Sequence, residues 1–253
     1  MSSLSVKKED FAVLSENIRV LYEDSDIIVC SKPAGLPVQS ANMRVKDMES
    51  ILKLYLLEKG SSQKGEPYIG VVHRLDQPVQ GIVVFAKNKM AAADLSGQMA
   101  DKGEKGQVRK RYCAVVQRAP DAEKKYVPGA YEELVDYLLK DGRTNTSRIV
   151  PKGTKGAKES RLRLHICREK ESLAFADIEL LTGRHHQIRV QLAGVQMPVA
   201  GDQKYGYVNT KENGRPKKEI LALCAYGLSF RHPRTGKTME FFVKPEGGAF
   251  KEF

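Results

Sequence analysis

The chain has 253 residues, of which 41% are hydrophobic, so it is long enough to bury one or two packed cores. Lys and Arg (42) exceed Asp and Glu (31), which gives a net charge of +11 and a pI of about 9.4. Such an excess favours binding to phosphate polymers, and to a lesser degree to anionic membranes. The sequence lacks the roughly 20 consecutive apolar residues of a membrane span and an apolar secretion segment. We therefore expect a cytoplasmic protein.

The four cysteines lie far apart, at positions 30, 113, 167 and 224, and each has apolar neighbours. Closely spaced cysteines would indicate a disulfide framework or a zinc site. Isolated cysteines in apolar surroundings are typical of reduced thiols in a core. The sequence therefore predicts four buried thiols and no metal.

The first half of the chain predicts strands that alternate with helices. After a polar leader over 1–16, Asp24-Ser25-Asp26 indicates a tight turn before a strand over 27–30. Pro and Gly in residues 32–35 predict a loop, and apolar residues at helical spacing predict an amphipathic helix over 46–59. The sequence further predicts two short strands, at 71–72 and 82–86, and a helix over about 89–100.

The second half predicts mainly strands, over 112–116, 161–167, 173–180, about 220–230 and 238–243. The last two are connected by the turn sequence HPRTGK. In residues 184–195, Ile188, Leu192 and Val195 recur at i, i+4 and i+7, which predicts a helix that packs on a sheet. Because strands outnumber helices and mostly follow one another, we predict an α+β fold with a mainly antiparallel mixed sheet, flanked by helices and loops.

Three loop-like segments are strongly basic, at 102–111, 151–161 and 209–218. Each alone is typical of a solvated loop. Together they are candidate contacts to the phosphates of a nucleic acid.

Several enzyme classes have no local support in the sequence. It contains no GxSxG, GxxxxGK[ST], GxGxxG or HExxH motif, which removes the local signals of serine hydrolases, P-loop NTPases, dinucleotide enzymes and zincins. His185 and His186 are adjacent, and on a helix they would project about 100° apart, so we do not expect them to share a metal.

Asp76 is the acid that calls for an explanation, because it follows His73 and Arg74 and lies between two apolar strands. Burial raises the pKa of a carboxyl group, whereas an arginine within about 4–6 Å lowers it by roughly 1–3 units. A buried Asp–Arg pair would therefore keep the carboxylate ionised and able to act as a nucleophile or base. From these residues alone, a structural ion pair is the better interpretation.

Five motifs resemble, in order, those of the RluA-type pseudouridine synthases, and SDIIVCSKPAGLPV (25–38) is similar to that family's first strand and loop. The resemblance covers roughly residues 18–245. The five motifs are HRLD (73–76) followed by a Gly and a strand ending in FAK, KRYCAVV (110–116), TGRHHQIRVQLA (182–193), GDQKYG (201–206) and LCAYGLSFRHPRTGK (223–237).

The resemblance implies isomerisation of uridine to pseudouridine in ribosomal or transfer RNA, without a cofactor or metal. Asp76 would be the catalytic carboxylate, either adding to C1′ of the ribose or removing its 2′ proton. Tyr112 would pack on the uracil and take the C5 proton, and Arg189 would pair with Asp76. Arg74 would help to hold the target nucleotide out of its stack. His73, Arg184 and Gln187 are further candidates for substrate binding.

The sequence departs from the family pattern at Val79-Gln80, where Thr-Ser usually precedes the glycine, and at Gln191 and Cys224, where the family often has histidines. These changes put the surrounding hydrogen bonds and the substrate preference in question more than the reaction. We expect residues 17–253 to form a single catalytic domain, with no separate S4-like module, and the protein to be a monomer.

Two other functions remain open. A non-catalytic RNA-binding or ribosome-assembly protein could keep the same fold and basic surface, and a nucleosidase with an Asp nucleophile would release free uracil.

Overall fold

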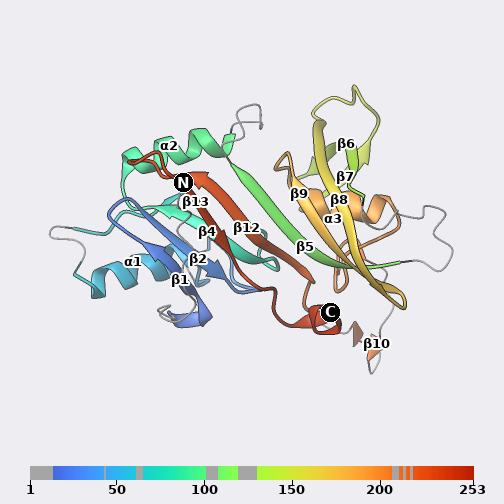
Figure 1. The fold of residues 1–253 in the computed structure, drawn as a ribbon, viewed down its shortest axis with the longest axis horizontal. Coiled ribbons are helices and arrows are strands. Elements are labelled where there is room, and N and C mark those ends of the chain that lie inside the picture. Colours follow the sequence, from blue (N-terminus) through green and yellow to red (C-terminus); the bar gives the residue numbers. More distant parts are fainter. Residues whose placement is uncertain are drawn as a thin grey trace. The chain divides into compact units, whose positions relative to one another are not determined.

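The computed structural model describes residues 14–42, 44–60, 65–100, 108–118, 130–206, 211–212, 215–216 and 219–253. The chain divides into two compact units (Figure 1). The first unit consists of residues 1–109 and 225–244, and the second of residues 110–224 and 245–253. Most of the predicted leader lies outside the described residues, and a single catalytic domain over 17–253 stays a prediction.

The sheet of the first unit follows the strand order β1-β2-β4-β12, with β3 beside β4 and β13 beside β12. The pairs β1–β2, β2–β4, β3–β4 and β12–β13 are antiparallel. Its elements are a 3₁₀ turn (Ser15–Asn17), β1 (Arg19–Glu23), β2 (Ile27–Lys32), α1 (Met48–Glu58), β3 (Gly70–Val71), β4 (Gln80–Ala86), α2 (Lys89–Ala100), β12 (Leu223–Arg231) and β13 (Thr238–Phe242).

The core of the first unit lies around β2 and β4, in which every residue is buried. Side chains from these strands, β12, β13 and α2 form one hydrophobic cluster, which includes Ile27, Val84, Leu95 and Phe230. Helix α1 begins where the side chain of Asp47 accepts the N–H of Ser50, a regular N-cap. The segment that contains Asp76 enters β4, which is buried along its whole length.

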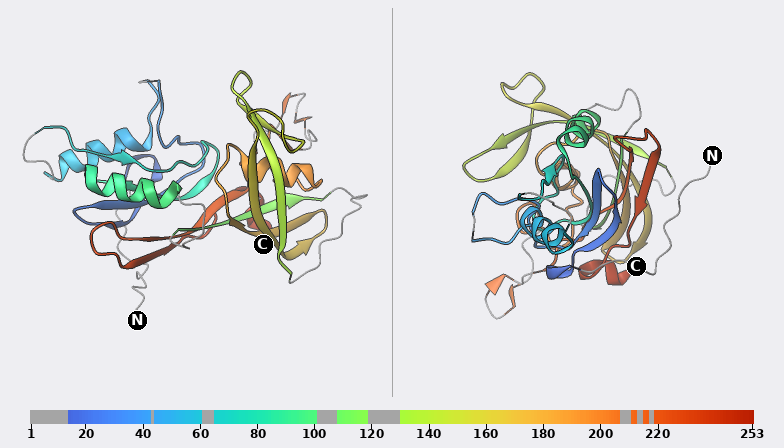
Figure 2. Two further views of the ribbon diagram at one scale, coloured as in Figure 1. Left: turned by 90° about the horizontal axis from the view of Figure 1, so that it is seen from above. Right: turned by 90° about the vertical axis from the view of Figure 1, so that its left-hand side faces the viewer.

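The sheet of the second unit follows the order β5-β9-β8-β6-β7, and all its pairs are antiparallel. Helix α3 packs against β6 and β7 (Figure 2). The elements are β5 (Arg109–Gln117), β6 (Glu132–Asp141), β7 (Thr146–Val150), β8 (Lys158–Lys170), β9 (Leu173–Leu180), α3 (Gln187–Gly194), a two-stranded sheet of β10 (Lys211–Glu212) and β11 (Arg215–Pro216), and a 3₁₀ turn (Gly248–Glu252).

The predicted α+β class is confirmed, and so are the helices near 48–58 and 89–100 and the predicted strands. Three details are corrections. Helix α3 begins only at Gln187, because His186 adopts a left-handed backbone conformation. Residues 109–111 belong to strand β5, and 158–161 to β8, rather than to basic loops. No helix in the described part of the chain is long and apolar enough to cross a membrane.

Cys167 is exposed, and the prediction of a buried thiol there was wrong. Leu162, Leu164 and Ile166 of β8 face the core, so alternation turns Cys167 toward the opposite, exposed face. The other three cysteines are buried, as predicted.

Candidate active site

Asp76 lies half-buried in the connection between β3 and β4, in the first unit. The N–H of Val79 donates to the carbonyl of Asp76 (3.0 Å), which closes a turn directly before β4. Upstream, the Nε2 atom of His73 accepts the backbone N–H of Val84 in β4 (3.1 Å). The segment is therefore fastened to the rigid strand on both sides of the acid.

A buried lysine fixes the same segment through the residue that follows Asp76. Lys32, whose exposed fraction is 1%, ends β2 and donates from Nζ to the carbonyls of Pro33 (2.9 Å), Leu36 (2.6 Å) and Gln77 (3.0 Å). Gln77 is bonded twice more, because Gly35 N–H donates to its carbonyl and its own amide donates to the carbonyl of Gly35, both at 2.9 Å. The loop after β2 and the segment of Asp76 thus form one hydrogen-bonded structure.

The ammonium group of Lys32 also gives Asp76 a cationic neighbour. Burial lowers the pKa of Lys32 to about 7, and the charge of Asp76 opposes this shift. Three carbonyl acceptors match the three N–H groups of a protonated lysine, so the geometry favours the charged form. The sequence predicted Lys32 only as part of a loop. Its position at the end of an apolar strand and before a proline was the signal that could have indicated a buried lysine.

Gly81 allows β12 to approach β4 closely beside this segment. Its φ is +128°, and a Cβ atom there would lie 2.3 Å from the carbonyl oxygen of Ala225. Val79 and Gln80, which replace the usual Thr-Ser, are both buried. Arg74, by contrast, is exposed, as a residue that contacts a substrate can be.

The other predicted catalytic residues belong to the second unit. Tyr112 is mostly buried in β5, where it pairs in register with Ile178 of β9. Arg189 lies in α3 and forms a two-bond fork with Asp202, from Nε to Oδ2 and from Nη2 to Oδ1, both at 2.7 Å. Because Asp76 belongs to the first unit, its pairing with Arg189 stays a prediction.

Sequence reasoning missed Asp202 and Tyr205 as partners of Arg189, although both lie in the quoted motif GDQKYG. The Arg189 guanidinium lies over the Tyr205 ring, 5.1 Å from its centroid. The Tyr205 hydroxyl accepts the N–H of Ser147 and donates to Nδ1 of His186, each at 2.8 Å.

The two histidines stack on each other, with ring centroids 3.8 Å apart and planes 25° apart. The expected divergence of about 100° was wrong because neither residue lies in the helix. Nδ1 of His185 accepts the hydroxyl of Ser147 (2.9 Å), and its Nε2 donates to Asn145 (3.1 Å). Burial lowers the pKa of His185 to about 4 and that of His186 to about 3, and nearby cations add to both shifts. Both rings are neutral at pH 7.

Gln187 and Arg184 make contacts within the second unit. The Gln187 carbonyl oxygen accepts from the Thr182 hydroxyl (2.8 Å) and the N–H of Arg184 (3.0 Å), and its amide donates to the carbonyl of Arg161 and to Gln191. These bonds use the hydrogen-bonding capacity of the buried Gln187 side chain. Arg184 donates from Nε to the carbonyl of Glu159 (2.9 Å). Substrate contacts by Gln187 and Arg184 stay predictions, with a structural role evident for Gln187.

Gln191, where the family often has a histidine, connects α3 with the sheet. Its amide donates to the carboxylate of Asp136 (2.8 Å) and to the carbonyls of Leu134 and Ser160 (both 3.3 Å). The amide of Gln191 is therefore fully hydrogen-bonded in this chain without a histidine at this position.

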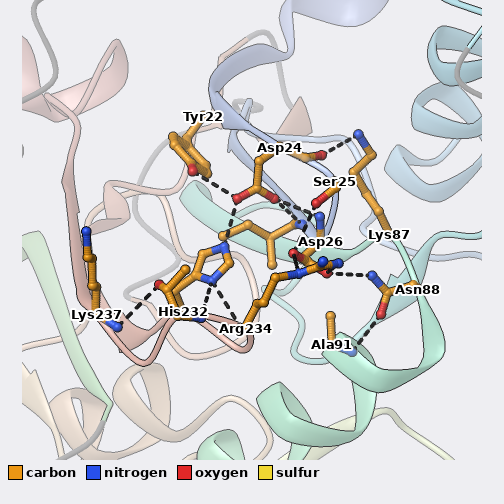
Figure 3. Close-up of polar contacts among 12 residues, drawn as sticks. Tyr22, Asp24, Ser25, Asp26, Lys87, Asn88, Ala91, His232, Arg234 and Lys237 are labelled. Atoms are coloured by element: carbon orange, nitrogen blue, oxygen red, sulfur yellow. Dashed lines mark hydrogen bonds and ion pairs between the residues drawn. The ribbon is translucent and has the colours of Figure 1, made fainter.

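Asp24, Asp26 and His232 form a cluster with the atoms to bind a metal ion, but the protein already supplies their partners (Figure 3). His232 Nε2 donates to Asp24 (2.7 Å), and its Nδ1 accepts the N–H groups of Arg234 and Thr235. Arg234 binds both oxygens of Asp26 and lowers its pKa to about 2. The cluster thus fastens the turn between β12 and β13 to the turn between β1 and β2.

The fold is that of pseudouridylate synthase domains. The solved structure of human RNA pseudouridylate synthase domain containing 4 matches with a TM-score of 0.69 and 20% identity, over 90% of this chain and 88% of that one. The solved structure of human RNA pseudouridylate synthase domain containing 1 matches with a TM-score of 0.60 and 21% identity, over 96% of this chain and 86% of that one.

The sequence comparisons define the family. Residues 26–194 match the family profile of RNA pseudouridylate synthases. An uncharacterized RNA pseudouridine synthase of Aquifex aeolicus is 31% identical over 93% of this chain and 72% of its own length. The ribosomal large subunit pseudouridine synthase C of Haemophilus influenzae is 28% identical over 93% and 70%. The chain belongs to the RNA pseudouridylate synthase family, is an RNA pseudouridine synthase and has RNA as its substrate, which confirms the predicted family and enzyme class.

Proposed function

We propose that the protein isomerises specific uridines of ribosomal or transfer RNA and that Asp76 is the carboxylate that acts on the ribose. In this proposal Tyr112 packs on the uracil and Arg189 pairs with Asp76. Arg74 and His73 contact the target nucleotide, and so do Arg184 and Gln187. The name of the Haemophilus influenzae relative makes ribosomal RNA the first substrate to test.

One observation carries the role of Asp76: its segment is fixed at both ends and has a buried ammonium group beside it. The bonds of Lys32 and His73 hold the acid to β2 and β4, and Lys32 interacts electrostatically with it. A carboxylate that must meet one carbon of a sugar needs such a fixed position. A neighbouring cation favours its ionised form, which is the form that acts as nucleophile or base.

The chemistry requires a nucleotide that has left its stack, because neither C1′ nor C5 can be rearranged inside a helix. The exposed Arg74, two residues before Asp76, is placed in sequence to contact such a nucleotide. After the glycosidic bond breaks, the uracil turns and rejoins through C5, and the C5 proton leaves. Each uridine that is converted therefore releases one hydrogen from C5.

The test follows tritium release from RNA labelled at uridine C5, with wild-type protein and the Asp76→Asn variant. We expect release by the wild type, loss of release by at least about 100-fold in Asp76→Asn, and RNA affinity unchanged within about twofold. Ribosomal and transfer RNA are assayed separately, and nucleoside analysis of the product measures pseudouridine and free uracil.

The other outcomes identify the alternatives. Binding without release from either RNA would support a non-catalytic RNA-binding protein, against the family assignment. Free uracil without pseudouridine would indicate a nucleosidase. Release that persists in Asp76→Asn would disprove the role of Asp76, and an equal loss of RNA binding in this variant would identify Asp76 as a structural acid.

A further inference from the structure

The fork between Arg189 and Asp202 is deeply buried, with exposed side-chain fractions of 5% and 0%. Removing two charges from water is costly, and a buried ion pair often adds little net stability compared with apolar residues of similar volume. What such a pair provides is a fixed geometry, because a carboxylate bound by Nε and Nη2 holds the plane of the guanidinium. The pair therefore suggests a requirement for precise placement of Arg189.

Asp202 is itself fixed from several directions. Its Oδ1 also accepts the N–H groups of Lys204 (2.9 Å) and Tyr205 (3.1 Å), and its carbonyl accepts the N–H of Gly206 (2.9 Å). A Cβ atom at Gly201 would lie 2.5 Å from the carbonyl oxygen of Ile220, and one at Gly206 would lie 2.3 Å from that of Asp202. The segment 201–206 is thus a tight turn around the carboxylate.

Tyr205 supports the guanidinium from its face. The 5.1 Å distance from the guanidinium carbon to the ring centroid lies within the range of a cation–π contact. The ring is held in turn, since its hydroxyl bonds to Ser147 in β7 and to His186 just before α3. The neutral state of His186 leaves its Nδ1 able to accept this bond, and adds no positive charge beside Arg189.

We propose that Asp202 and Tyr205 are positioning residues for the isomerisation. The fork binds the edge of the Arg189 guanidinium through two of its five N–H groups, and the Tyr205 ring covers its face. With the edge and the face of the guanidinium both fixed, Arg189 holds its side chain in one orientation. This inference rests on the proposed function, in which Arg189 is the partner of Asp76.

The test compares Asp202→Asn with Asp26→Asn. Asp26 receives the same two-bond fork, from Nε (2.6 Å) and Nη2 (2.7 Å) of Arg234, and its side chain is also buried. Both substitutions remove one negative charge and weaken one fork, but only Asp202 holds Arg189. Measurements are kcat and KM for tritium release from the RNA substrate, the dissociation constant for that RNA, and the midpoint of thermal unfolding.

We expect Asp202→Asn to lower kcat by about 100-fold, the loss that a misplacement of about 1 Å can cause. Its KM and RNA dissociation constant should stay within about twofold of wild type. Asp26→Asn should lower the unfolding midpoint and leave kcat within about twofold. A kcat for Asp202→Asn within about threefold of wild type, in folded protein, would overturn the inference, as would equal losses of kcat in the two variants.

Three further variants keep the inference testable if Asp202→Asn folds poorly. Asp202→Glu keeps the charge but shifts the fork by one methylene, and should also lower kcat. Arg189→Lys keeps the cation without the fork, and Asp202→Asn should then cause little further loss in the double variant. Additive losses would contradict the coupling. Tyr205→Phe keeps the ring and removes only the hydroxyl, so it should lower the unfolding midpoint and leave kcat near wild type. A large loss of kcat with an unchanged midpoint would contradict the role of the ring.

The controls separate this inference from the proposed function. A wild-type protein without activity on either RNA would remove both. An active wild type that loses activity in Asp76→Asn but retains it in Asp202→Asn would remove only the positioning role.

Discussion

Lys32 shows how one buried side chain sets the position of a reacting group. Its three bonds join the end of β2 to the loop after it and to the residue that follows Asp76. A buried carbonyl without a partner costs about 1–3 kcal/mol. Lys32→Met would remove the Lys32 bond from all three carbonyls, of which that of Gln77 keeps the N–H of Gly35. We therefore expect Lys32→Met to lower the free energy of unfolding by about 2 kcal/mol or more, measured by urea denaturation.

The matched control is Lys59→Met, because Lys59 bonds to Glu23 near the surface, where its side chain is half exposed. An exposed ion pair contributes about 1 kcal/mol or less, so this variant should unfold close to wild type. Equal stabilities of the Lys32 and Lys59 variants would show that the three carbonyl contacts do not anchor the segment.

The neutral histidines predict a pH dependence of stability. Burial lowers the pKa of His186 to about 3 and that of His185 to about 4, whereas an unfolded histidine titrates near 6.5. Between these values the unfolded chain binds more protons than the folded one. The contribution of the two histidines to the free energy of unfolding should therefore be fully present above about pH 6.5. It should fall as the pH decreases toward 4, by about 2–4 kcal/mol for the pair after allowance for solvent screening.

Urea unfolding at pH 7.5, 5.5 and 4.5 measures this slope. His186→Asn is the control, because asparagine tolerates the left-handed backbone at this position, where φ is 55°, and its side-chain oxygen can accept the Tyr205 hydroxyl. The variant should lose stability less steeply on acidification. An identical slope in both proteins would show that His186 does not titrate in this range.

At the scale of single residues, the sequence predicted candidates better than their partners. The stretches around Asp76 and Arg189 were found from motifs, but Lys32 and Asp202 were not recognised as their supports. A partner such as Asp202 lies 13 residues from Arg189, and only the tertiary fold brings the two together. The prediction that His185 and His186 diverge was wrong for a local reason. Adjacent side chains diverge in this way only within a helix, and His186 precedes the helix with a positive φ.

At the scale of elements, the approach of β12 to β4 depends on Gly81. Its Cβ would overlap the backbone of Ala225, and backbone atoms cannot move aside as the end of a side chain can. Its φ of +128° adds strain for any other residue. We expect Gly81→Ala to lower the free energy of unfolding by about 3 kcal/mol or more and to reduce tritium release, because the substitution distorts the strand that fixes Asp76.

Gly97→Ala provides the opposite expectation within the same unit. Gly97 is exposed in α2, with nothing within 4 Å of an added Cβ. Because alanine is a better helix former, this variant should gain about 0.5–1 kcal/mol. If Gly81→Ala were as stable as wild type, the close approach of the two strands would not be required.

Strands β6 and β7 are among the elements that the sequence failed to predict, as are β1, β10 and β11. Strand β6 has the sequence EELVDYLLKD, in which only Leu134 and Leu138 are buried. Their spacing of four residues is as compatible with a helix as with a strand, so periodicity carries no clear signal there. The strands β2 and β4 were predictable because both are continuous apolar runs buried along their whole length.

At the scale of the whole molecule, the net charge of +11 predicts RNA binding that depends strongly on salt. Of the three basic segments, residues 102–107 and most of 209–218 lie outside the described residues. Lys152 and Lys155 are described and exposed, in the turns between β7 and β8. They are therefore the residues at which the contribution of a basic segment can be tested against a known local structure.

Replacing both lysines with alanine should weaken RNA binding. If each contacts one phosphate, the slope of log affinity against log salt should become shallower by about 0.7 for each lysine on single-stranded RNA. Replacing both with arginine preserves the charge and should preserve the slope. The rate at saturating RNA should stay near wild type in both variants, because neither lysine belongs to the proposed catalytic set. A slope unchanged by alanine would place the RNA path elsewhere on the protein, whereas a lower rate at saturating RNA would mean that these turns also help to align the target uridine.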